Sequence, residues 1–496
     1  MRQNIRFIRK GQMVEVSAFT PTALLLDYLR DSEGAKGTKE GCGEGDCGAC
    51  TVVLGRLRDG KLVYEPVNSC IQLLGQVDGT EIITVEDLAD PSGGLHPVQT
   101  AMVEKHASQC GFCTPGFVMS LFAMYHATER KVTRDEVNDW IAGNLCRCTG
   151  YRPIVDAGIA ACNGLRRDRF RGAAADTTGL LGFLSDNEDV FLGDDDHFFA
   201  APGTVDSLCD LYEKHPAATI VAGATDVGLW ITKQFRDLPK IIHIGRARGL
   251  DRIDDTGFEL IIGAGATYAQ AEPHLRAIDP DIGELVRRLG SKQVRASGTV
   301  CGNVANGSPI GDTPPVLIAL GATVELRKGK RVRTMPIEEF YIDYGKQNRQ
   351  PGELVTALIV PKLAAGNIFR CYKVSKRFDQ DISSVMGAFR FAVSEEGTIT
   401  EARIAFGGMA GIPKRAKGAE LALQGAALRD SRIWARAFAA LRDDFTPLND
   451  HRASARYRQE TAHALLGKAL IEAAGTSSRR TRVIGFREKV EADGSR

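Results

Sequence analysis

Eight of the twelve cysteines in this chain of 496 residues form two groups, and their spacing restricts the fold more than any other feature. In the first group, Cys42, Cys47 and Cys50 stand at C-x4-C-x2-C, and Cys70 follows in the segment VNSC. This is the plant-type ligand spacing of a 2Fe-2S cluster. A structural zinc site or a set of buried thiols is the weaker interpretation, because zinc sites favour paired C-x2-C units.

The loop with the first three cysteines must aim thiolates at two irons and backbone N–H groups at the cluster sulfurs. Glycines give this loop the backbone freedom that it needs: Gly41, Gly43, Gly45 and Gly48. Before the loop, residues 5–7 and 13–16 predict a hairpin around Lys10 and Gly11. Thr20 and Pro21 then predict a helix over residues 21–29, with threonine as its N-cap and proline at its first position.

The second group combines C-x2-C at Cys110 and Cys113 with C-x-C at Cys146 and Cys148. The segment that begins with Thr114 and Pro115 predicts an amphipathic helix over residues 114–126. The pair Thr133 and Glu136 predicts a capping box for a second helix, which ends at residues 143–144. Both cysteine pairs therefore lie at helix ends, where four thiolates can meet. Zinc remains an alternative for this group, because four cysteines are all that zinc needs.

Size and charge restrict the other possibilities. A chain of this length with 43% hydrophobic residues is too long for one core and predicts three or four domains. Lys plus Arg (63) nearly balances Asp plus Glu (62), which argues against nucleic acid and anionic membranes as partners. No apolar run approaches the roughly 20 residues of a membrane span, and the N-terminus does not look like a signal peptide. We therefore expect a cytoplasmic protein whose cysteines bind metal and do not form disulfides.

Residues 166–196 are polar and irregular and predict a linker. The segment ATIVAGATDVGLWITKQF then predicts a strand, a turn of small residues and a helix, and such a turn can present N–H groups to a pyrophosphate. A Rossmann fingerprint fails, because Gly263 and Gly265 lack the third glycine. Residues 293–322 are rich in glycine and predict a long loop in which Asp312 can accept hydrogen bonds from ribose hydroxyls. Composition alone leaves a purely structural loop equally possible.

Several remaining residues have no predicted part in the chemistry. Four isolated cysteines are expected to be small buried apolar residues: Cys162, Cys209, Cys301 and Cys371. His96 has no metal-ligand spacing partner and is interpreted as structural. After residue 361 the sequence predicts strands near 370–374, 387–393 and 404–407, followed by helices from residue 416. The tail from Thr476, with Arg479, Arg480 and Arg482, is expected to be a mobile end that forms no binding patch.

Three motifs carry a family resemblance. GCGEGDCGACTV, QCGFCTPGF and GNLCRCTGYRPI resemble the iron-sulfur region of the xanthine dehydrogenase and aldehyde oxidase family of molybdenum hydroxylases, and all eight ligand positions are filled. The resemblance implies that Cys110, Cys113, Cys146 and Cys148 hold the cluster nearer the molybdenum. The ferredoxin-like cluster, nearer the flavin, would be held by Cys42, Cys47, Cys50 and Cys70.

The flavin segments resemble the FAD domain of the same family, which is similar to the vanillyl-alcohol-oxidase (PCMH) type. The resemblance assigns the pyrophosphate to Ile220, Val221, Ala222, Gly223, Ala224, Thr225, Asp226 and Val227, and a second flavin loop to Thr299, Val300, Cys301, Gly302 and Asn303. It places Asp312 at the adenosine ribose and Lys373 near the flavin. Leu289 stands where the family often has an aromatic residue beside the flavin, so the stacking residue is not identified.

The resemblance implies a multidomain α+β fold. Its parts are a β-grasp ferredoxin-type domain (1–86), a helical 2Fe-2S domain (87–165), a linker (166–193), an FAD-binding domain (194–362), an α+β flavoprotein C-terminal domain (363–472) and a tail (473–496). The molybdopterin region of the family has no counterpart here, which implies a separate large subunit, in an α2β2 heterotetramer as in bacterial members with clusters and FAD on one chain.

The implied function is electron transfer during the oxidation of hypoxanthine and xanthine to urate. Electrons would pass from the partner's molybdopterin centre through the two 2Fe-2S clusters to FAD and on to NAD⁺. No catalytic residue for substrate oxidation is expected on this chain. One alternative is the equivalent subunit of a hydroxylase that acts on an aldehyde or an N-heterocycle. The other is a stand-alone iron-sulfur flavoprotein reductase.

Overall fold

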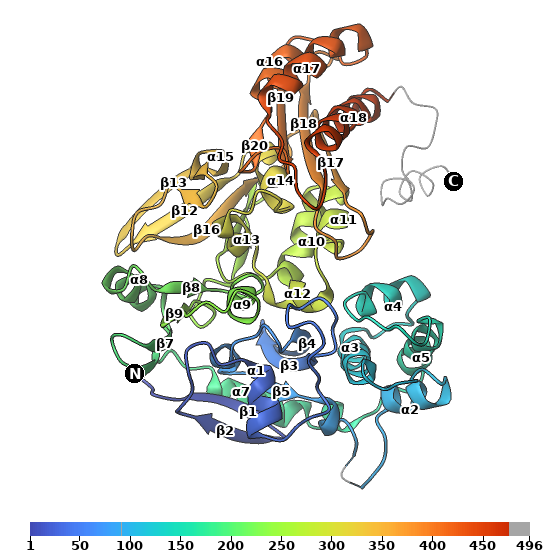
Figure 1. Cartoon of the computed structure of the whole chain (residues 1–496), viewed down its shortest axis with the longest axis vertical. Helices are drawn as coiled ribbons and strands as arrows, with labels where there is room; N and C mark the ends of the chain where they lie inside the picture. Colours follow the sequence, from blue (N-terminus) through green and yellow to red (C-terminus); the bar gives the residue numbers. More distant parts are fainter. Residues whose placement is uncertain (91, 476–496) are drawn as a thin grey trace. The chain divides into compact units, whose positions relative to one another are not determined.

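The computed structural model describes residues 1–90 and 92–475, which form two compact units whose elements are labelled in Figure 1. The first unit comprises Met1–Gly249 and Gly290–Gly298, and the second comprises Leu250–Leu289 and the chain from Thr299 onward. The arginines of the C-terminal tail lie outside the described residues, so the expectation for them stays a prediction.

The first unit begins with a five-stranded sheet in the order β2-β1-β5-β3-β4. Its strands are β1 (Ile5–Arg9), β2 (Gln12–Val16), β3 (Thr51–Arg58), β4 (Lys61–Asn68) and β5 (Glu81–Ile83). Strands β1 and β5 run parallel, and the other neighbours are antiparallel. Short helical turns connect the strands: α1 (Leu25–Asp27), η1 (Tyr28–Ser32), η2 (Leu74–Val77) and η3 (Val85–Asp87). The hairpin predicted at the N-terminus is confirmed as β1 and β2.

The helix predicted to begin at Thr20 and Pro21 is wrong at its start. Helix begins only at Leu25, and Thr20 accepts a turn hydrogen bond from Ala23. The N–H group of Leu25 donates to the carbonyl of Gln72 at 2.8 Å, and Leu74 donates to Ala23 at 2.7 Å. This pairing holds the chain extended where the local sequence favours helix.

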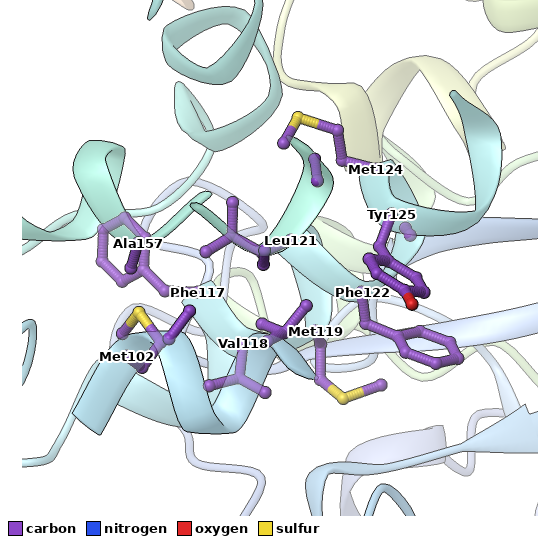
Figure 2. Close-up of a cluster of buried hydrophobic side chains, with 14 of the residues drawn as sticks. Met102, Phe117, Val118, Met119, Leu121, Phe122, Met124, Tyr125 and Ala157 are labelled. Atoms are coloured by element: carbon purple, nitrogen blue, oxygen red, sulfur yellow. The ribbon is translucent and has the colours of Figure 1, made fainter. Parts of the chain in front are cut away.

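Four helices follow: α2 (Pro97–Glu104), α3 (Thr114–Ala127), α4 (Arg134–Ile141) and α5 (Arg152–Asn163). Every residue of α3 from Gly116 to Tyr125 is buried, so the predicted helix exists but is not amphipathic. Figure 2 shows its side chains Phe117, Leu121 and Phe122 in the core, with Met102 of α2 and Ala157 of α5 close by. The predicted capping box is confirmed, because Thr133 and Glu136 cap α4 reciprocally.

The irregular structure predicted for residues 166–196 is wrong, since the segment contains two helices, α6 (Arg169–Gly172) and α7 (Ala174–Leu184). Asp168 caps α6 by accepting a hydrogen bond from the N–H group of Arg171. Phe170 is buried in the helical core, and Leu181 and Leu184 pack on Ile8 of the sheet. Two small apolar contacts therefore hold this polar segment on the domains that precede it.

The remainder of the first unit is a small sheet in the order β6-β7-β9-β8, with three short helices. These elements are β6 (Val190–Gly193), β7 (Phe198–Ala201), α8 (Val205–Lys214), β8 (Thr219–Val221), α9 (Val227–Thr232), β9 (Lys240–His243) and α12 (Lys292–Ser297). The predicted strand, turn and helix are confirmed as β8, residues 222–226 and α9.

The second unit has a five-stranded antiparallel sheet in the order β10-β11-β16-β12-β13. Its strands are β10 (Ile253–Asp255), β11 (Glu259–Gly263), β12 (Thr323–Lys328), β13 (Arg331–Pro336) and β16 (Leu354–Pro361), beside the two-stranded β14 (Tyr341–Asp343) and β15 (Lys346–Gln347). Its helices are α10 (Tyr268–Ile278), α11 (Pro280–Arg287), α13 (Val300–Asn306), α14 (Thr313–Leu320) and α15 (Ile337–Phe340).

The long glycine-rich loop predicted over residues 293–322 is wrong, because most of it is helical. Thr299 caps α13 by accepting a hydrogen bond from Gly302 at 3.0 Å. Gly307 and Gly321 adopt left-handed conformations that end α13 and α14. The glycines therefore separate short helices and do not form an open loop.

The end of the second unit is a four-stranded sheet with helices after it, so the three predicted strands and the helices are confirmed and a short fourth strand was not predicted. Its strands are β17 (Asn367–Val374), β18 (Val385–Val393), β19 (Ile399–Gly407) and β20 (Lys414–Arg415), followed by α16 (Lys417–Leu423), α17 (Ser431–Asp444) and α18 (Ala455–Ala474). The predicted multidomain α+β class is confirmed. Among the described residues, no helix combines the length and the apolar character that a membrane crossing needs.

Candidate iron-sulfur and flavin sites

The first four cysteines meet at the loop before β3 and the end of β4. The Sγ atoms of Cys50 and Cys70 lie 3.2 Å apart, and the Cys42 thiol makes hydrogen bonds to those of Cys47 and Cys70. The side-chain hydrogen bond from Cys47 lowers the pKa of Cys42. The N–H groups of Glu44 and Cys47 both point at the Cys42 sulfur, at 3.4 Å. Converging sulfurs and inward amides fit a 2Fe-2S cluster.

Glycine is required at specific points of this loop. Gly43, Gly45 and Gly48 have φ angles of +63°, +76° and +70°. A Cβ atom on Gly48 would lie 2.1 Å from the carbonyl oxygen of Gly143. Gly41 has ordinary φ, but a Cβ atom there would lie 2.8 Å from the Cys47 sulfur. The glycines allow both the left-handed turns and the close approach of the chain to the thiols.

The second four cysteines meet where α3 begins and where the chain passes from α4 to α5. Cys110 pairs with Cys148, and Cys113 pairs with Cys146, through thiol hydrogen bonds. Burial raises the pKa of Cys113 to about 12. Cys110 and Cys148 are exposed, which gives this group an open side. The four isolated cysteines are all buried, as expected.

His96 has partners that its sequence position did not reveal. Its Nε2 lies 3.0 Å from Asp168 Oδ2, and Nε2 of His126 lies 2.9 Å from the same oxygen. Burial opposes the charge on Asp168, but hydrogen bonds from both histidines hold its pKa well below the usual range. Asp168 lies in the segment interpreted as a linker, so no spacing signal connected the three residues.

This group of three could be mistaken for a metal site. However, His96 Nδ1 accepts a hydrogen bond from the N–H group of Val98, so the proton of the neutral ring is on Nε2 and points at Asp168. A protonated nitrogen cannot bind a metal ion. The group instead ties α6 to α2 and α3, in agreement with the structural interpretation of His96.

The pyrophosphate segment lies in the first unit, between β8 and α9. Ala224 has φ +58°, a left-handed conformation at a residue other than glycine. Within residues 1–90 and 92–475, the N–H groups of Gly223, Ala224 and Thr225 donate to no other group. A Cβ atom on Gly223 would lie 1.9 Å from the carbonyl oxygen of Ser297. Successive free amides around a left-handed residue form a concavity that fits an anion.

The same turn packs against the loop that follows the first cysteine group. Gln76 Nε2 donates to the carbonyl of Ala222 at 2.7 Å. A Cβ atom on Gly228 would lie 2.8 Å from the carbonyl oxygen of Ile71, the residue after Cys70. The first cysteine group and the predicted pyrophosphate turn are therefore neighbours within one compact unit.

The other predicted flavin residues lie in the second unit. Residues 299–303 form the start of α13, and Asn303 Oδ1 accepts a hydrogen bond from Thr313 at 2.8 Å. Asp312 and Lys373, predicted separately, form a buried ion pair. Ser383 Oγ donates to the second oxygen of Asp312. A carboxylate has about four acceptor positions, so this pair leaves capacity for a ribose hydroxyl.

Four family models match the chain in sequence. The 2Fe-2S iron-sulfur cluster binding domain matches residues 7–71, and the 2Fe-2S binding domain matches residues 84–158. The FAD binding domain in molybdopterin dehydrogenase matches residues 195–363, and the CO dehydrogenase flavoprotein C-terminal domain matches residues 370–473.

The matching relatives include several xanthine dehydrogenases. That of Emericella nidulans is 31% identical over 498 aligned residues, which cover 89% of this chain and 36% of the relative. That of Oryza sativa subsp. japonica is 30% identical and covers 81% of this chain and 34% of the relative. The chain thus spans about a third of the length of the curated relatives that it matches.

Solved structures give a second line of comparison. A chain of the CO dehydrogenase from Oligotropha carboxidovorans matches with a TM-score of 0.52 and 26% identity, covering 57% of this chain and 99% of that one. A chain of quinoline 2-oxidoreductase from Pseudomonas putida matches with a TM-score of 0.51 at 21% identity, which shows a shared fold alone; it covers 55% of this chain and 95% of that one. With two 2Fe-2S domains, an FAD-binding domain and a flavoprotein C-terminal domain in this order, the chain belongs to the molybdenum hydroxylase family.

Proposed function

We propose that this chain is the small subunit of a xanthine dehydrogenase, which passes electrons from a molybdenum-containing large subunit to NAD⁺. The observation that carries the proposal is the content of the first unit, which contains two groups of four cysteines and a turn whose free amides fit an anion. We propose that the four domains comprise residues 1–86, 87–165, 194–362 and 363–472.

The proposed oxidation of xanthine by NAD⁺ is divided between two subunits, and its atoms and electrons balance over both. On the partner, xanthine and water would give urate, two electrons and two protons. NAD⁺ would take the two electrons and one proton to become NADH, so one proton is released. Bound FAD would supply the conversion between single electrons from the clusters and the electron pair that NAD⁺ accepts.

The residues of this chain would bind and orient the cofactors. Cys42, Cys47, Cys50 and Cys70 would hold the ferredoxin-type cluster, and Cys110, Cys113, Cys146 and Cys148 the helical-domain cluster. The free amides of residues 223–225 would bind the FAD pyrophosphate, and Asp312 would bind its ribose. Contact of the turn with the loop after Cys70 supports electron entry to the flavin from the ferredoxin-type cluster.

Two findings support the partner and the substrate. The match extends over 99% of the CO dehydrogenase chain, which supports a molybdopterin region on a separate subunit, in an α2β2 assembly, and the names of the matching relatives support xanthine as the substrate. Exposure of Cys110 and Cys148 supports electron entry at the helical-domain cluster from that subunit. The match to CO dehydrogenase chains favours a second candidate, the equivalent subunit of a hydroxylase with a different substrate.

Purification of the tagged chain from its own cells tests the proposal. We expect a large subunit with molybdenum to co-purify, and the complex to reduce NAD⁺ with xanthine or hypoxanthine. A complex that oxidises only aldehydes or other N-heterocycles would favour the second candidate, the equivalent subunit of a hydroxylase with a different substrate. Purification of the chain without any molybdenum subunit would favour a stand-alone reductase and contradict both.

A further inference from the structure

One cysteine of the second group receives two hydrogen bonds from a single residue in the loop between α4 and α5. The N–H group of Thr149 donates to the Sγ atom of Cys146 at 3.4 Å, and the Oγ1 atom of Thr149 lies 3.3 Å from the same sulfur. Thr149 is half-buried. Both polar groups of this threonine therefore lie within hydrogen-bond distance of one thiol.

The other partner of the Thr149 hydroxyl determines its direction. The N–H group of Tyr151 donates to Thr149 Oγ1 at 3.1 Å, so the hydroxyl oxygen already accepts one hydrogen bond. A cysteine that binds iron is a thiolate and has no proton to donate. In the contact with Cys146 the hydroxyl is therefore the donor, and a chain of hydrogen bonds runs from the Tyr151 amide through the Thr149 hydroxyl to the sulfur.

Tyr151 closes this loop with its side chain as well as its backbone. Its phenolic oxygen accepts a hydrogen bond from the N–H group of Cys146 at 2.9 Å, and its ring packs edge-on against buried Phe117 of α3. The φ angle of Tyr151 is +69°, in the left-handed region that residues other than glycine seldom occupy. Strain of this kind persists only where the surrounding contacts fix the residue. The contacts of Tyr151 with Cys146 and Thr149 provide that constraint.

The first cysteine group has no equivalent donor. The Cys42 sulfur accepts hydrogen bonds from two backbone N–H groups, those of Glu44 and Cys47. Within residues 1–90 and 92–475, no hydroxyl other than that of Thr149 lies within hydrogen-bond distance of a sulfur of either cysteine group. The first group can therefore serve as an internal reference for an effect of Thr149.

We infer that Thr149 raises the reduction potential of the helical-domain cluster through its hydrogen bonds to Cys146, and that Tyr151 is the positioning residue that directs the Thr149 hydroxyl. This inference rests on the proposed binding of a 2Fe-2S cluster by the second cysteine group. The reduced cluster carries one more negative charge than the oxidised one, so donors at its sulfurs stabilise the reduced form more. The step is the gain of one electron, in which no bond forms or breaks and no proton moves.

The test uses the full chain purified with both clusters and FAD. Thr149→Val removes the hydroxyl at nearly constant volume and keeps the backbone N–H group, whereas Thr149→Ser keeps the hydroxyl. Tyr151→Phe removes only the phenolic oxygen. The matched control is Thr128→Val, because Thr128 is a half-buried threonine of the same helical region whose hydroxyl donates to the carbonyl oxygen of Met124. EPR during a redox titration measures the reduced fraction of each cluster.

We expect Thr149→Val to lower the ratio of reduced to oxidised helical-domain cluster several-fold at a fixed potential; for a one-electron couple, a tenfold change corresponds to about 59 mV. Thr149→Ser should keep the original ratio. Tyr151→Phe should show a smaller decrease, because the Thr149 hydroxyl then leaves the sulfur for part of the time. The ferredoxin-type cluster should keep its potential in every variant, and both clusters should keep theirs in Thr128→Val.

An unchanged ratio in Thr149→Val would overturn the inference, as would an equal decrease in Thr149→Ser or Thr128→Val. An unchanged ratio in Tyr151→Phe would contradict the positioning role of Tyr151. If Thr149→Val does not assemble the cluster, Thr149→Ala decides by the same titration. Loss of the cluster in both variants would assign Thr149 to cluster assembly and contradict its effect on the potential.

The two proposals fail in different ways. Absence of the helical-domain cluster from the unmodified chain would contradict the proposed function. A normal cluster whose potential does not depend on Thr149 would contradict only the present inference.

Discussion

At the residue scale, the buried pair of Asp312 and Lys373 connects stability with flavin binding. The side chains are 8% and 2% exposed, so each charge depends on the other for neutralisation. Removal of one partner from such a pair leaves an uncompensated buried charge, which costs about 3–5 kcal/mol. A loss of FAD in a variant of Asp312 or Lys373 therefore has to be separated from a loss of folding.

We predict that Asp312→Asn and Lys373→Met each lower the thermal stability of the second unit and the FAD content of the purified chain. The double variant should recover part of the stability but not the FAD, because it removes the charge imbalance together with the ribose acceptor. Thermal unfolding and FAD quantification check this. Ser383→Ala, which keeps the ion pair, is the control. Full FAD content in the double variant would contradict a ribose contact.

A second prediction at this scale concerns Cys148, which is exposed in the second cysteine group. Cys148→Ser should remove the helical-domain cluster and leave the ferredoxin-type cluster, so that iron falls to about half, since each 2Fe-2S cluster has its own four ligands. Flavin reduction by NADH should persist, because the path from flavin to the first cluster does not include Cys148.

Iron analysis, EPR and stopped-flow reduction by NADH measure this outcome. Cys162→Ala is the matched control, because Cys162 is a buried cysteine of the same helical region that belongs to neither group. Equal loss of both cluster signals in Cys148→Ser would speak against two independent ligand sets.

At the element scale, close packing fixes the backbone conformation of the turn between β8 and α9. We predict that Gly223→Ala abolishes FAD binding while both clusters remain, because its Cβ atom would lie 1.9 Å from the Ser297 carbonyl and displace the free amides. The control is Gly179→Ala in α7, where no atom lies within 4 Å of the new Cβ atom. The visible spectrum after cofactor extraction reports FAD and iron separately. Normal FAD content in Gly223→Ala would exclude the turn as the pyrophosphate site.

The elements that could be predicted from sequence are those with a local cause. The hairpin of β1 and β2, the capping box of α4 and the strand, turn and helix at residues 219–232 follow from turn residues, caps and apolar periodicity. The cysteine groups follow from ligand spacing, which is a chemical constraint independent of packing. Both kinds of signal can be recognised in the sequence without knowledge of the tertiary fold.

The elements that sequence missed are those decided by distant contacts. Pairing with Gln72 and Leu74 delays the helix after Thr20, and contacts of Phe170, Leu181 and Leu184 fold the presumed linker. The histidines His96 and His126 contact Asp168, and Gln293 donates to Thr51, Ser120 and Asn144. Both groups join residues far apart in the chain, so sequence spacing does not predict them.

At the scale of the whole molecule, the division of labour between two subunits gives the last prediction. The chain expressed alone should transfer electrons from NADH to an artificial dye but should not oxidise xanthine or hypoxanthine. Hydroxylation of a purine carbon needs a centre that activates water and accepts two electrons at once, and each predicted metal site here is a set of four cysteines suited to a one-electron cluster.

The dye assay with NADH and the urate assay with xanthine measure the two halves of the reaction on one preparation. The variant Gly223→Ala, predicted to lack FAD, should lose the dye activity and so shows that the electrons pass through the flavin. Addition of the large subunit should then restore xanthine oxidation to the original chain but not to Cys148→Ser, because entry from the molybdenum centre requires the helical-domain cluster. Urate formation by the chain alone, free of molybdenum, would contradict the assignment of substrate oxidation to the partner.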